Sequence, residues 1–456
     1  MSDRNQAGPR DAGNEIFETI PVPRAYLSLA MPVVMGMVVT LVYNLVDTFF
    51  VAQTGNLDLV AGVSLASPVL TLMIAMGDMF GLGGSSVISR YFGQHKDEIG
   101  RRISVFCYYG ALVWGIVVAA LLLIFRTPIL YLMGADETTF LYTSQYYTII
   151  VLGAPFLILT FVPRNQLRSE GNSVASMIGS ILGTVVNIIL DPILILGLNM
   201  GAAGAAIATV IGYICNDIYY TVFIIRKSPK ISVSLKGFHI APREITPIFA
   251  IGLPSSITNL VASFATMITN LFLLPYGTDC VAAMGIAAKV NMIVLMILIG
   301  LAFGGQALMG YNYGSGDRKR LREILRFAYL CECGLALVLS IFLAIAAPLL
   351  IRCFLTDPDV IAYGTLMLRM MQPGMLFTGI VLVSTCMFQS AGKALQALSL
   401  SAGRQGVIFL LVMVIASQLA GYYGVIAAQA ISDILTAGLA VVLMWVTFYR
   451  KKGMPA

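Results

Sequence analysis

The sequence predicts an all-α membrane protein whose twelve transmembrane helices form two six-helix lobes, related by a parallel pseudo-two-fold repeat. Three observations predict this fold. Of the 456 residues, 58% are hydrophobic and only 11% are charged, whereas an ordinary soluble domain has about 25% charged residues. The apolar residues form runs of about 20 or more, enough to cross a bilayer core of roughly 30 Å as a helix. The third observation is an internal repeat at an offset of 220 to 222 residues.

Each apolar run is predicted to form one membrane-spanning helix, because its length matches the bilayer core. In chain order the predicted spans are 28–52, 60–89, 103–125, 142–163, 173–198, 202–225, 246–274, 281–311, 325–348, 361–390, 395–419 and 423–448. The longest and most basic connection follows the sixth span, and we take it as the linker between the lobes. The expected divisions are a tail at 1–25, a first lobe at 26–226, a linker at 227–245, a second lobe at 246–449 and a tail at 450–456.

The basic residues indicate orientation. Most of the 28 Lys and Arg fall in the two tails and in the loops after even-numbered spans, whereas the opposite side carries Arg126 and Arg352. This is the positive-inside pattern, so the net charge of +6 does not indicate nucleic-acid binding. The first 25 residues lack the apolar core and cleavage site of a signal peptide. We therefore expect a multi-pass protein of the cell (cytoplasmic) membrane with both termini in the cytoplasm.

The repeat relates matching motifs in the same order. LAMPVV at 29–34 matches IGLPSS at 251–256, and RSEGN at 168–172 matches QSAGK at 389–393. Each unit has six spans, so both enter the membrane in the same direction, as in parallel-repeat transporters with a cavity between the halves. The repeat breaks at polar positions. The pairs there are Asp47 with Thr269, Asn187 with Ile408, Asp191 with Val412, and Thr209 with Gln429.

These unmatched polar residues are predicted to share one depth in the first lobe. Asp47 and Asp191 each lie eight residues before the outer end of an outward-running helix, and Thr209 lies eight residues into an inward-running one. At about 1.5 Å per residue, all three are roughly 12 Å below the outer surface. Asn187 is one turn before Asp191 on the same face. Carboxylates, an amide and a hydroxyl together can hold a proton or Na⁺, the only metal ion that this sequence suggests. The alternative is a satisfied polar core.

Other chemistry has little support in the sequence. Seven cysteines lie almost entirely within predicted spans, and the only histidines are His95 and His239. Neither a metal centre nor a catalytic triad is expected from these residues. No G-x-x-x-x-G-K-[ST] motif occurs, so nucleotide hydrolysis by this chain is not expected. GLGGSS at 81–86 lies inside a span, where small residues allow close helix packing. We expect no cofactor beyond the coupling ion.

The chain resembles the MATE family, the multidrug and toxic compound extrusion transporters, over residues 24 to 448. The resemblance is carried by Pro32 with YNLVDTFFVAQTG, by GGSSVISRYFGQ, by NIILDPILILGLNMGAAGAAIAT and by the two-lobed repeat. It implies twelve helices and export driven by a proton or sodium gradient. It also implies a cation site at Asp47, Asn187, Asp191 and Thr209, with a bend at Pro32, as in the DinF- and MepA-like branch. The acidic residues that NorM-like relatives carry in helices 7 and 10 are absent, which favours protons.

The expected function is antiport of amphipathic, mostly cationic drugs or toxins across the lipid bilayer, by a monomer and without enzymatic activity. Two alternatives are a lipid-linked precursor flippase, which would have extra helices and a strongly basic cavity, and an intramembrane aspartyl protease using Asp47 and Asp191. Candidates for the pathway or substrate cavity are Tyr43, Asn44, Met292, Met296 and Arg369. For other charged residues near the spans, structural pairing or snorkelling is the favoured interpretation. These are Asp78, Asp217, Lys289, Glu332, Arg404 and Asp433.

Overall fold

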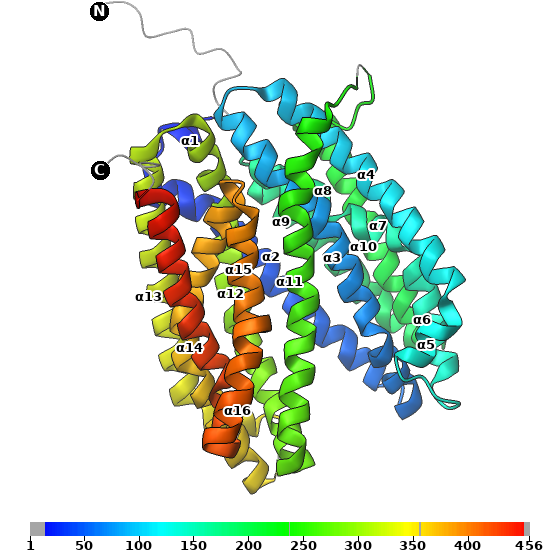
Figure 1. The fold of residues 1–456 in the computed structure, drawn as a ribbon. Helices are drawn as coiled ribbons and strands as arrows, with labels where there is room; N and C mark the ends of the chain where they lie inside the picture. The colour runs from blue at the N-terminus through cyan, green and yellow to red at the C-terminus, as the bar shows by residue number, and fades with distance from the viewer. Residues whose placement is uncertain (1–13, 237, 355–356, 451–456) are drawn as a thin grey trace, which may run out of the picture. The chain divides into compact units, whose positions relative to one another are not determined.

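The structure is a computed structural model that describes residues 14–236, 238–354 and 357–450. Most of both predicted tails lies outside these residues. The described chain is almost entirely helical (Figure 1). Its longer helices are α2 (Val22–Ala52), α3 (Leu57–Gly93), α4 (Asp97–Ile124), α6 (Phe140–Leu152), α9 (Ser173–Asp191), α10 (Gly201–Lys227), α11 (Pro242–Leu273), α12 (Thr278–Ser315), α13 (Arg318–Arg352), α14 (Pro358–Ser390) and α16 (Ile408–Met444). The shorter elements are α1 (Glu15–Glu18), α5 (Arg126–Leu132), α7 (Ala154–Leu159), α8 (Phe161–Ser169), η1 (Pro192–Gly197), η2 (Leu274–Tyr276), α15 (Ala394–Ala402), η3 (Gly403–Val407) and η4 (Trp445–Arg450).

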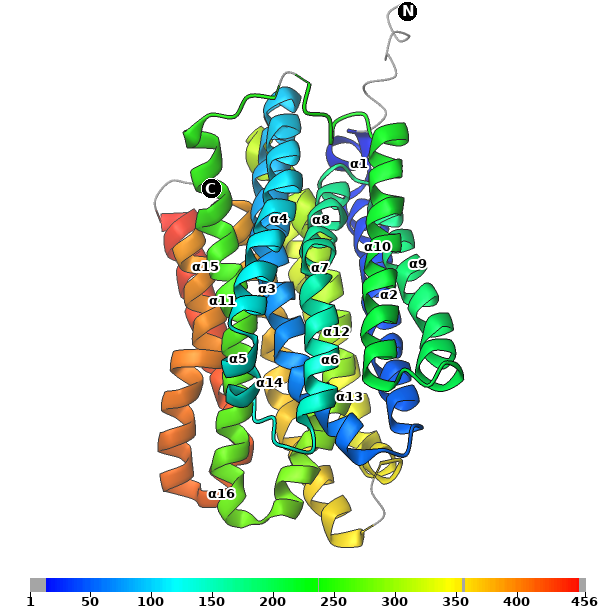
Figure 2. The same ribbon diagram turned by 90° about the vertical axis from the view of Figure 1, so that its right-hand side faces the viewer.

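The predicted all-α membrane fold is confirmed. Within the described residues, ten helices are long and apolar enough to cross a membrane. An eleventh span consists of α6 together with α7 and α8, which are bent by 57° where Pro155 interrupts the helix. The 55-residue apolar stretch Ala394–Phe448 holds the last two predicted spans. They meet at Gly421, whose φ of 55° and ψ of −128° suit only glycine, and the chain reverses direction there (Figure 2).

Side-chain caps mark where several helices begin. The Oδ1 atom of Asn56 accepts the Leu59 N–H at 3.1 Å at the start of α3. Asp317 accepts the Arg320 N–H at 2.9 Å before α13, and Asp357 accepts the Asp359 N–H at 2.9 Å before α14. Each acceptor satisfies a backbone donor that has no partner within its own helix. The apolar runs therefore become helices whose starts are set by the polar residues that precede them.

The described chain forms two compact units. Among the described residues, the first consists of 14–20 and Met35–Ser256, and the second consists of Pro21–Val34 and 257–450. Two helices, α2 and α11, begin in one unit and continue in the other. Each passes from one to the other two residues after a proline, Pro32 in α2 and Pro254 in α11. The bounds of these units differ from those of the predicted lobes, 26–226 and 246–449. The division of the chain into two functional lobes stays a prediction.

Small residues bring helices close together within each unit. In the first unit, a Cβ atom on Gly83 of α3 would lie 3.1 Å from the Gly252 Cα atom of α11. In the second unit, a Cβ atom on Gly304, the repeat partner of Gly83, would collide with Ala30 of α2. Glycine at these positions lets the backbones approach closely. The glycine-rich motif at 81–86 and its counterpart in the second half of the repeat thus allow close helix packing, as expected.

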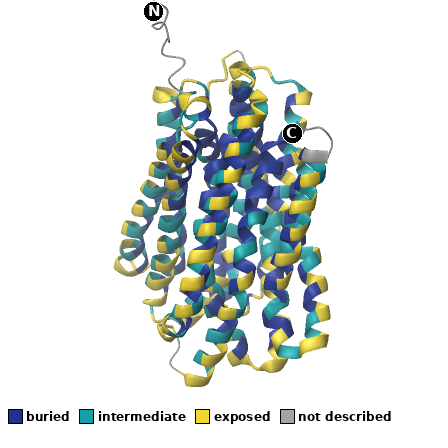
Figure 3. Cartoon of the chain, turned by 90° about the vertical axis from the view of Figure 1, so that its left-hand side faces the viewer, coloured by how far each residue is buried: buried dark blue, intermediate teal, exposed yellow. Residues whose placement is uncertain are grey.

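Exposed residues lie along the outer faces of the helices (Figure 3), and many of them are large and apolar. Leu419 is 82% exposed and Leu395 is 75% exposed. The buried positions include many small or polar residues on α3, α8 and α14. Such an apolar exterior suits lipid and would be poorly solvated in water. The chain is a multi-pass membrane protein.

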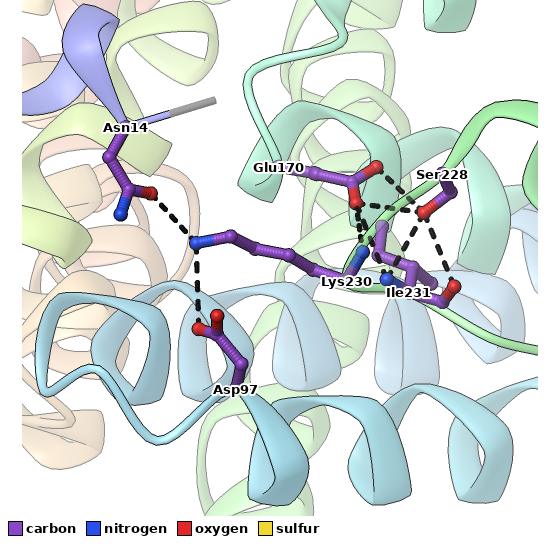
Figure 4. A network of polar contacts seen from close by, with 6 residues as sticks. All are labelled: Asn14, Asp97, Glu170, Ser228, Lys230 and Ile231. Atoms are coloured by element: carbon purple, nitrogen blue, oxygen red, sulfur yellow. Dashed lines mark hydrogen bonds and ion pairs between the residues drawn. The ribbon is translucent and has the colours of Figure 1, made fainter. Parts of the chain in front are cut away.

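The connection after α10 is anchored to the first unit by one carboxylate (Figure 4). Glu170, at the end of α8, accepts the Ser228 hydroxyl at 2.8 Å, the Lys230 N–H at 2.7 Å and the Ile231 N–H at 3.3 Å. The Lys230 Nζ atom donates to the Asn14 Oδ1 atom at 2.7 Å and lies 3.5 Å from an Asp97 carboxylate oxygen. The first part of the predicted linker therefore belongs structurally to the first unit.

Candidate functional site

Four polar residues predicted to share a depth meet inside the first unit. Asp47 comes from α2, Asn187 and Asp191 from the end of α9, and Thr209 from α10. Asn187 and Thr209 are each 2% exposed, and Asp191 is fully buried. The structure therefore brings together the residues that the sequence placed at one depth. Their role in coupling remains a prediction.

Two glycines determine how closely α9 and α10 approach each other. The two helices run side by side (Figure 2), and a Cβ atom on Gly212 would lie 2.8 Å from the Gly183 carbonyl oxygen. Asn187 lies one turn after Gly183, and Thr209 lies almost one turn before Gly212. Because the backbones touch here, the Asn187 side chain can reach the backbone of the neighbouring helix.

Asn187 connects Asp191 to α10. In the amide orientation that satisfies both of its polar atoms, Asn187 donates Nδ2 to the Asp191 Oδ2 atom at 2.8 Å and accepts the Thr209 N–H on Oδ1 at 3.0 Å. The carboxyl groups of Asp47 and Asp191 are neighbours in this site. The Oδ1 atom of each carboxyl is buried and has no hydrogen-bond partner among the described residues. The site therefore contains two adjacent carboxyl groups with one amide between Asp191 and the helix beside it.

The position of Asp191 follows from the proline after it. Pro192 carries no backbone N–H, and the chain changes at this residue from α-helix to the wider π-helical turn η1. π-Helical turns are rare and are often found at functional sites. Asp191 thus ends the regular part of α9 with its side chain directed into the unit.

Two tyrosines complete the surroundings of the carboxyl pair. The Tyr43 hydroxyl, a predicted pathway group on α2, lies 3.3 Å from the Thr209 Oγ1 atom. Tyr146 of α6 is 4% exposed and lies beside Asp47 and Thr209. Tyr146 was not predicted from the sequence as a residue of this site. The only sequence feature that could have indicated it is the polar Gln-Tyr-Tyr stretch inside an apolar run. That stretch does not reveal that α6 packs beside α10.

A small polar cavity of about 60 Å³ adjoins the cluster. Tyr43, Asn187 and Thr209 line it, together with Arg164 and Asn216. Liquid water occupies about 30 Å³ per molecule, so this cavity has room for roughly two waters and is too small for a drug-sized compound.

The remaining candidates for the pathway lie in different places. Asn44 is exposed on α2, and no hydrogen bond from its side chain to the cluster exists within the described residues. Met292 lines a larger cavity in the second unit, whereas Met296 is half-buried on α12 and is not part of that lining. Arg369 is exposed on α14, and its Nε atom donates to the Ala344 carbonyl at 3.0 Å.

The other charged residues of the spans also separate into groups. Arg404 and Asp433 form a buried ion pair, with Nε 2.8 Å from Oδ1, which fits the structural pairing favoured from sequence. Lys289 is exposed and Asp78 is half-buried, while Asp217 is buried beside Thr160. Glu332 is fully buried, and neither of its carboxyl oxygens has a hydrogen-bond partner among the residues that the structure describes.

Comparison with known proteins places this arrangement in a family. The chain is 29% identical over 430 residues to the multidrug export protein MepA of Staphylococcus haemolyticus, with 94% of each chain covered. It is 29% identical over 429 residues to the MepA protein of Staphylococcus aureus, covering 94% of this chain and 95% of that one. The confirmed resemblance extends along both halves of the repeat.

Solved structures share the fold. An outward-facing multidrug resistance MATE family transporter of the MOP superfamily superposes with a TM-score of 0.92 at 23% identity, covering 99% of this chain and all of the other. A MATE structure in the straight conformation also gives 0.92, at 24% identity, with 97% and 99% covered. The MatE family model matches residues 32–193 and again residues 254–416, one match in each half. The chain belongs to the MatE family of membrane transporters.

Proposed function

We propose that this protein is a multidrug exporter that couples the efflux of small amphipathic compounds to proton entry at Asp47 and Asp191. The export of drugs is the function named for its staphylococcal relatives, and the family supports transport by alternating access. The transporter acts as a single chain in the cell membrane. The basic residues at the loops after even-numbered spans support cytoplasmic termini.

The observation that carries this proposal is the proximity of the two carboxyl groups inside the first unit. Two adjacent carboxylates in a poorly solvated site repel each other and are each costly to desolvate. A single proton shared between them removes most of this cost. Protonation therefore changes how closely α2 can lie to α9, and this difference is what a coupling site requires.

The hydrogen bonds favour a proton over sodium. The Asn187 amide oxygen already accepts the Thr209 N–H, and the Thr209 hydroxyl is hydrogen-bonded to the Tyr43 hydroxyl. This leaves mainly the two carboxyl groups for an ion, whereas a hard metal cation gathers several oxygen ligands. A proton needs only two oxygens, so the site fits it better.

The available energy is sufficient for switching. One charge moving down a membrane potential supplies about 2.3 kcal/mol per 100 mV. Moving a two-state equilibrium from 1:99 to 99:1 takes about 5.5 kcal/mol. One or two protons, with a pH difference added to the potential, therefore suffice to bias the transporter between its two states.

The test is transport of a fluorescent cationic dye by purified protein in proteoliposomes. A proton gradient imposed without sodium should drive dye movement together with measurable proton counterflow, and Asp191→Asn should abolish both. Movement driven equally well by a sodium gradient at constant pH would contradict proton coupling. If neither gradient moved the dye or any of several unrelated drugs, the proposal that the protein is an exporter would be contradicted.

A further inference from the structure

The second unit contains a cavity with a different character. Its volume is about 330 Å³, within the range of small-molecule sites. Five methionines and Phe409 line it: Met284, Met292, Met371, Met375 and Met413. Methionine side chains are flexible and polarizable, so a surface rich in them adapts to differently shaped apolar groups. The same wall carries the buried ion pair of Arg404 and Asp433.

Asp433 has its hydrogen-bonding capacity occupied by protein. Its Oδ1 atom accepts the Arg404 Nε–H at 2.8 Å and the Gln429 Nε2–H at 2.9 Å. Its Oδ2 atom accepts the Thr378 hydroxyl at 3.3 Å, and the side chain is only 6% exposed. A ligand cation would therefore find few carboxylate lone pairs still available.

Arg404 has donors to spare. Besides its Nε bond to Asp433, it uses one Nη2 proton toward the Thr378 Oγ1 atom at 3.3 Å. A guanidinium has five N–H donors, and no partner for the Nη1 group occurs among the described residues. Its side chain is 13% exposed and forms part of the cavity wall. The charge that the cavity presents to a ligand is thus the positive end of the pair.

We propose that this cavity binds amphipathic compounds that carry a carboxylate, with Arg404 as the anchor. The carboxylate would accept two N–H groups from the side of the guanidinium opposite Asp433, the geometry in which arginine binds carboxylates most strongly. The aromatic or aliphatic body would pack on the methionines and Phe409. The amides of Asn270 and Gln405, also in the lining, can donate further hydrogen bonds. This inference rests on the proposed export function in one respect: it takes such carboxylate compounds as substrates for export.

Direct binding tests this without any transport. Three probes share one environment-sensitive fluorophore: dansylglycine is an acid, dansylamide is neutral, and N-(2-aminoethyl)dansylamide is an amine. Titrated into purified protein in nanodiscs, dansylglycine should bind about tenfold to a hundredfold more tightly than dansylamide, because hydrogen bonds to charged groups contribute roughly that much. The amine should bind most weakly. Equal affinities, or tightest binding by the amine, would overturn the proposal.

Variants locate the site. The double variant Arg404→Met with Asp433→Leu removes the ion pair without leaving a buried charge, so it should fold, and it should bind all three probes alike. Arg352→Met, which removes an exposed charge elsewhere in the second unit, should leave the preference intact. A preference for the acid that survives the double variant would place the site elsewhere.

One more variant separates this inference from the proposed function. Asp191→Asn, expected to be inactive in efflux, should bind dansylglycine as tightly as the parent because Asp191 lies in the first unit. Normal binding without proton-driven efflux in the parent would contradict the export mechanism alone. Active efflux without acid-selective binding would contradict the cavity assignment alone.

Discussion

The same pair of helix positions is used differently in the two units. In the first, Gly183 of α9 and Gly212 of α10 bring two backbones into contact. The repeat partner of Gly183 is Arg404, and that of Gly212 is Ser432, whose hydroxyl donates to the Arg404 carbonyl at 2.9 Å. The helices approach each other at the same place, but the second unit adds a large charged side chain there.

Further differences between equivalent positions accompany the carboxyl groups of the first unit and the larger cavity of the second. Where the first unit has Asn187 and Asp191, the second has Ile408 and Val412, and Gln429 replaces Thr209. The polar cavity of about 60 Å³ in the first unit corresponds to one of about 330 Å³ in the second. The two units therefore carry different side chains, and cavities of different size, at equivalent positions of the repeat.

The largest expected loss of efflux comes from variants of the carboxyl groups in the first unit. Asp191→Asn and Asp47→Asn should each reduce proton-driven efflux to background, because a neutral amide cannot cycle between charged and protonated forms. Drug resistance of cells and dye efflux at matched membrane abundance measure this. Asp58→Asn, which changes an exposed acid on α3, is the control and should retain efflux. Continued drug protection by the Asp47 or the Asp191 variant would make that residue only structural.

A second comparison concerns the two prolines where helices pass between units. Pro32→Ala restores a backbone N–H and favours a straight α2 by up to about 3 kcal/mol. It should therefore reduce efflux strongly, because α2 carries Asp47 and we propose that it bends during the cycle. Pro254→Ala should reduce efflux less, because α11 has Thr269 at the position of Asp47. Equal losses at matched expression would show that both helices hinge alike and that the asymmetric mechanism is wrong.

A third comparison contrasts two fully buried acids. Glu332 of α13 has no hydrogen-bond partner among the described residues, unlike Asp191. An unpaired buried carboxylate is costly, so we expect Glu332 to keep its proton throughout the cycle. Glu332→Gln should then change efflux by less than about twofold, since neither form carries a charge. Loss of efflux comparable to that of Asp191→Asn would show that the second unit also exchanges protons.

The smallest expected effect on transport concerns the connection after α10. Glu170 has Ala391 as its repeat partner, so Glu170→Ala gives the first unit the residue of the second. The variant loses the hydrogen bonds to Ser228, Lys230 and Ile231. Amide hydrogen exchange at 230–231 should accelerate by about tenfold or more, as expected for one or two net hydrogen bonds to a charged group. Unchanged exchange would mean that other contacts anchor this segment. Asp97→Asn, which changes the exposed carboxylate beside the Lys230 Nζ atom, should accelerate exchange less.

The pH dependence of this anchor has a definite sign. Burial raises the pKa of Glu170 above its ordinary value, and the hydrogen bonds from Lys230 and Ser228 only partly oppose this. The folded state then holds the proton more tightly than the unfolded state does. The contribution of Glu170 to stability is therefore present below the unfolded pKa and decreases as pH rises to the folded pKa. Glu170→Gln should remove that decrease, measured as exchange at 230–231 across pH 4 to 7. A decrease that persists in the variant would assign the titration to another group.

Much of the fold could be predicted from the sequence because a bilayer imposes simple requirements. Apolar runs of sufficient length must be helices, since no other open structure satisfies its backbone hydrogen bonds in lipid. The repeat indicated two halves, and the rise per residue placed Asp47, Asp191 and Thr209 at one depth. Because a carboxylate in an apolar run is costly, its presence indicated a polar site without any knowledge of neighbours.

Which side chains meet was decided only by tertiary packing. The participation of Tyr146, and the exposure of Asn44 and Arg369, depend on how each helix is rotated about its axis and which helix lies beside it. Depth along a helix follows from counting residues, whereas rotation and neighbours follow from the fit of whole surfaces. The pairing of Arg404 with Asp433 and the passage of α2 and α11 between units near their prolines are of this second kind. The sequence by itself determined the helices, the repeat and the depth of the acids, and packing decided their partners.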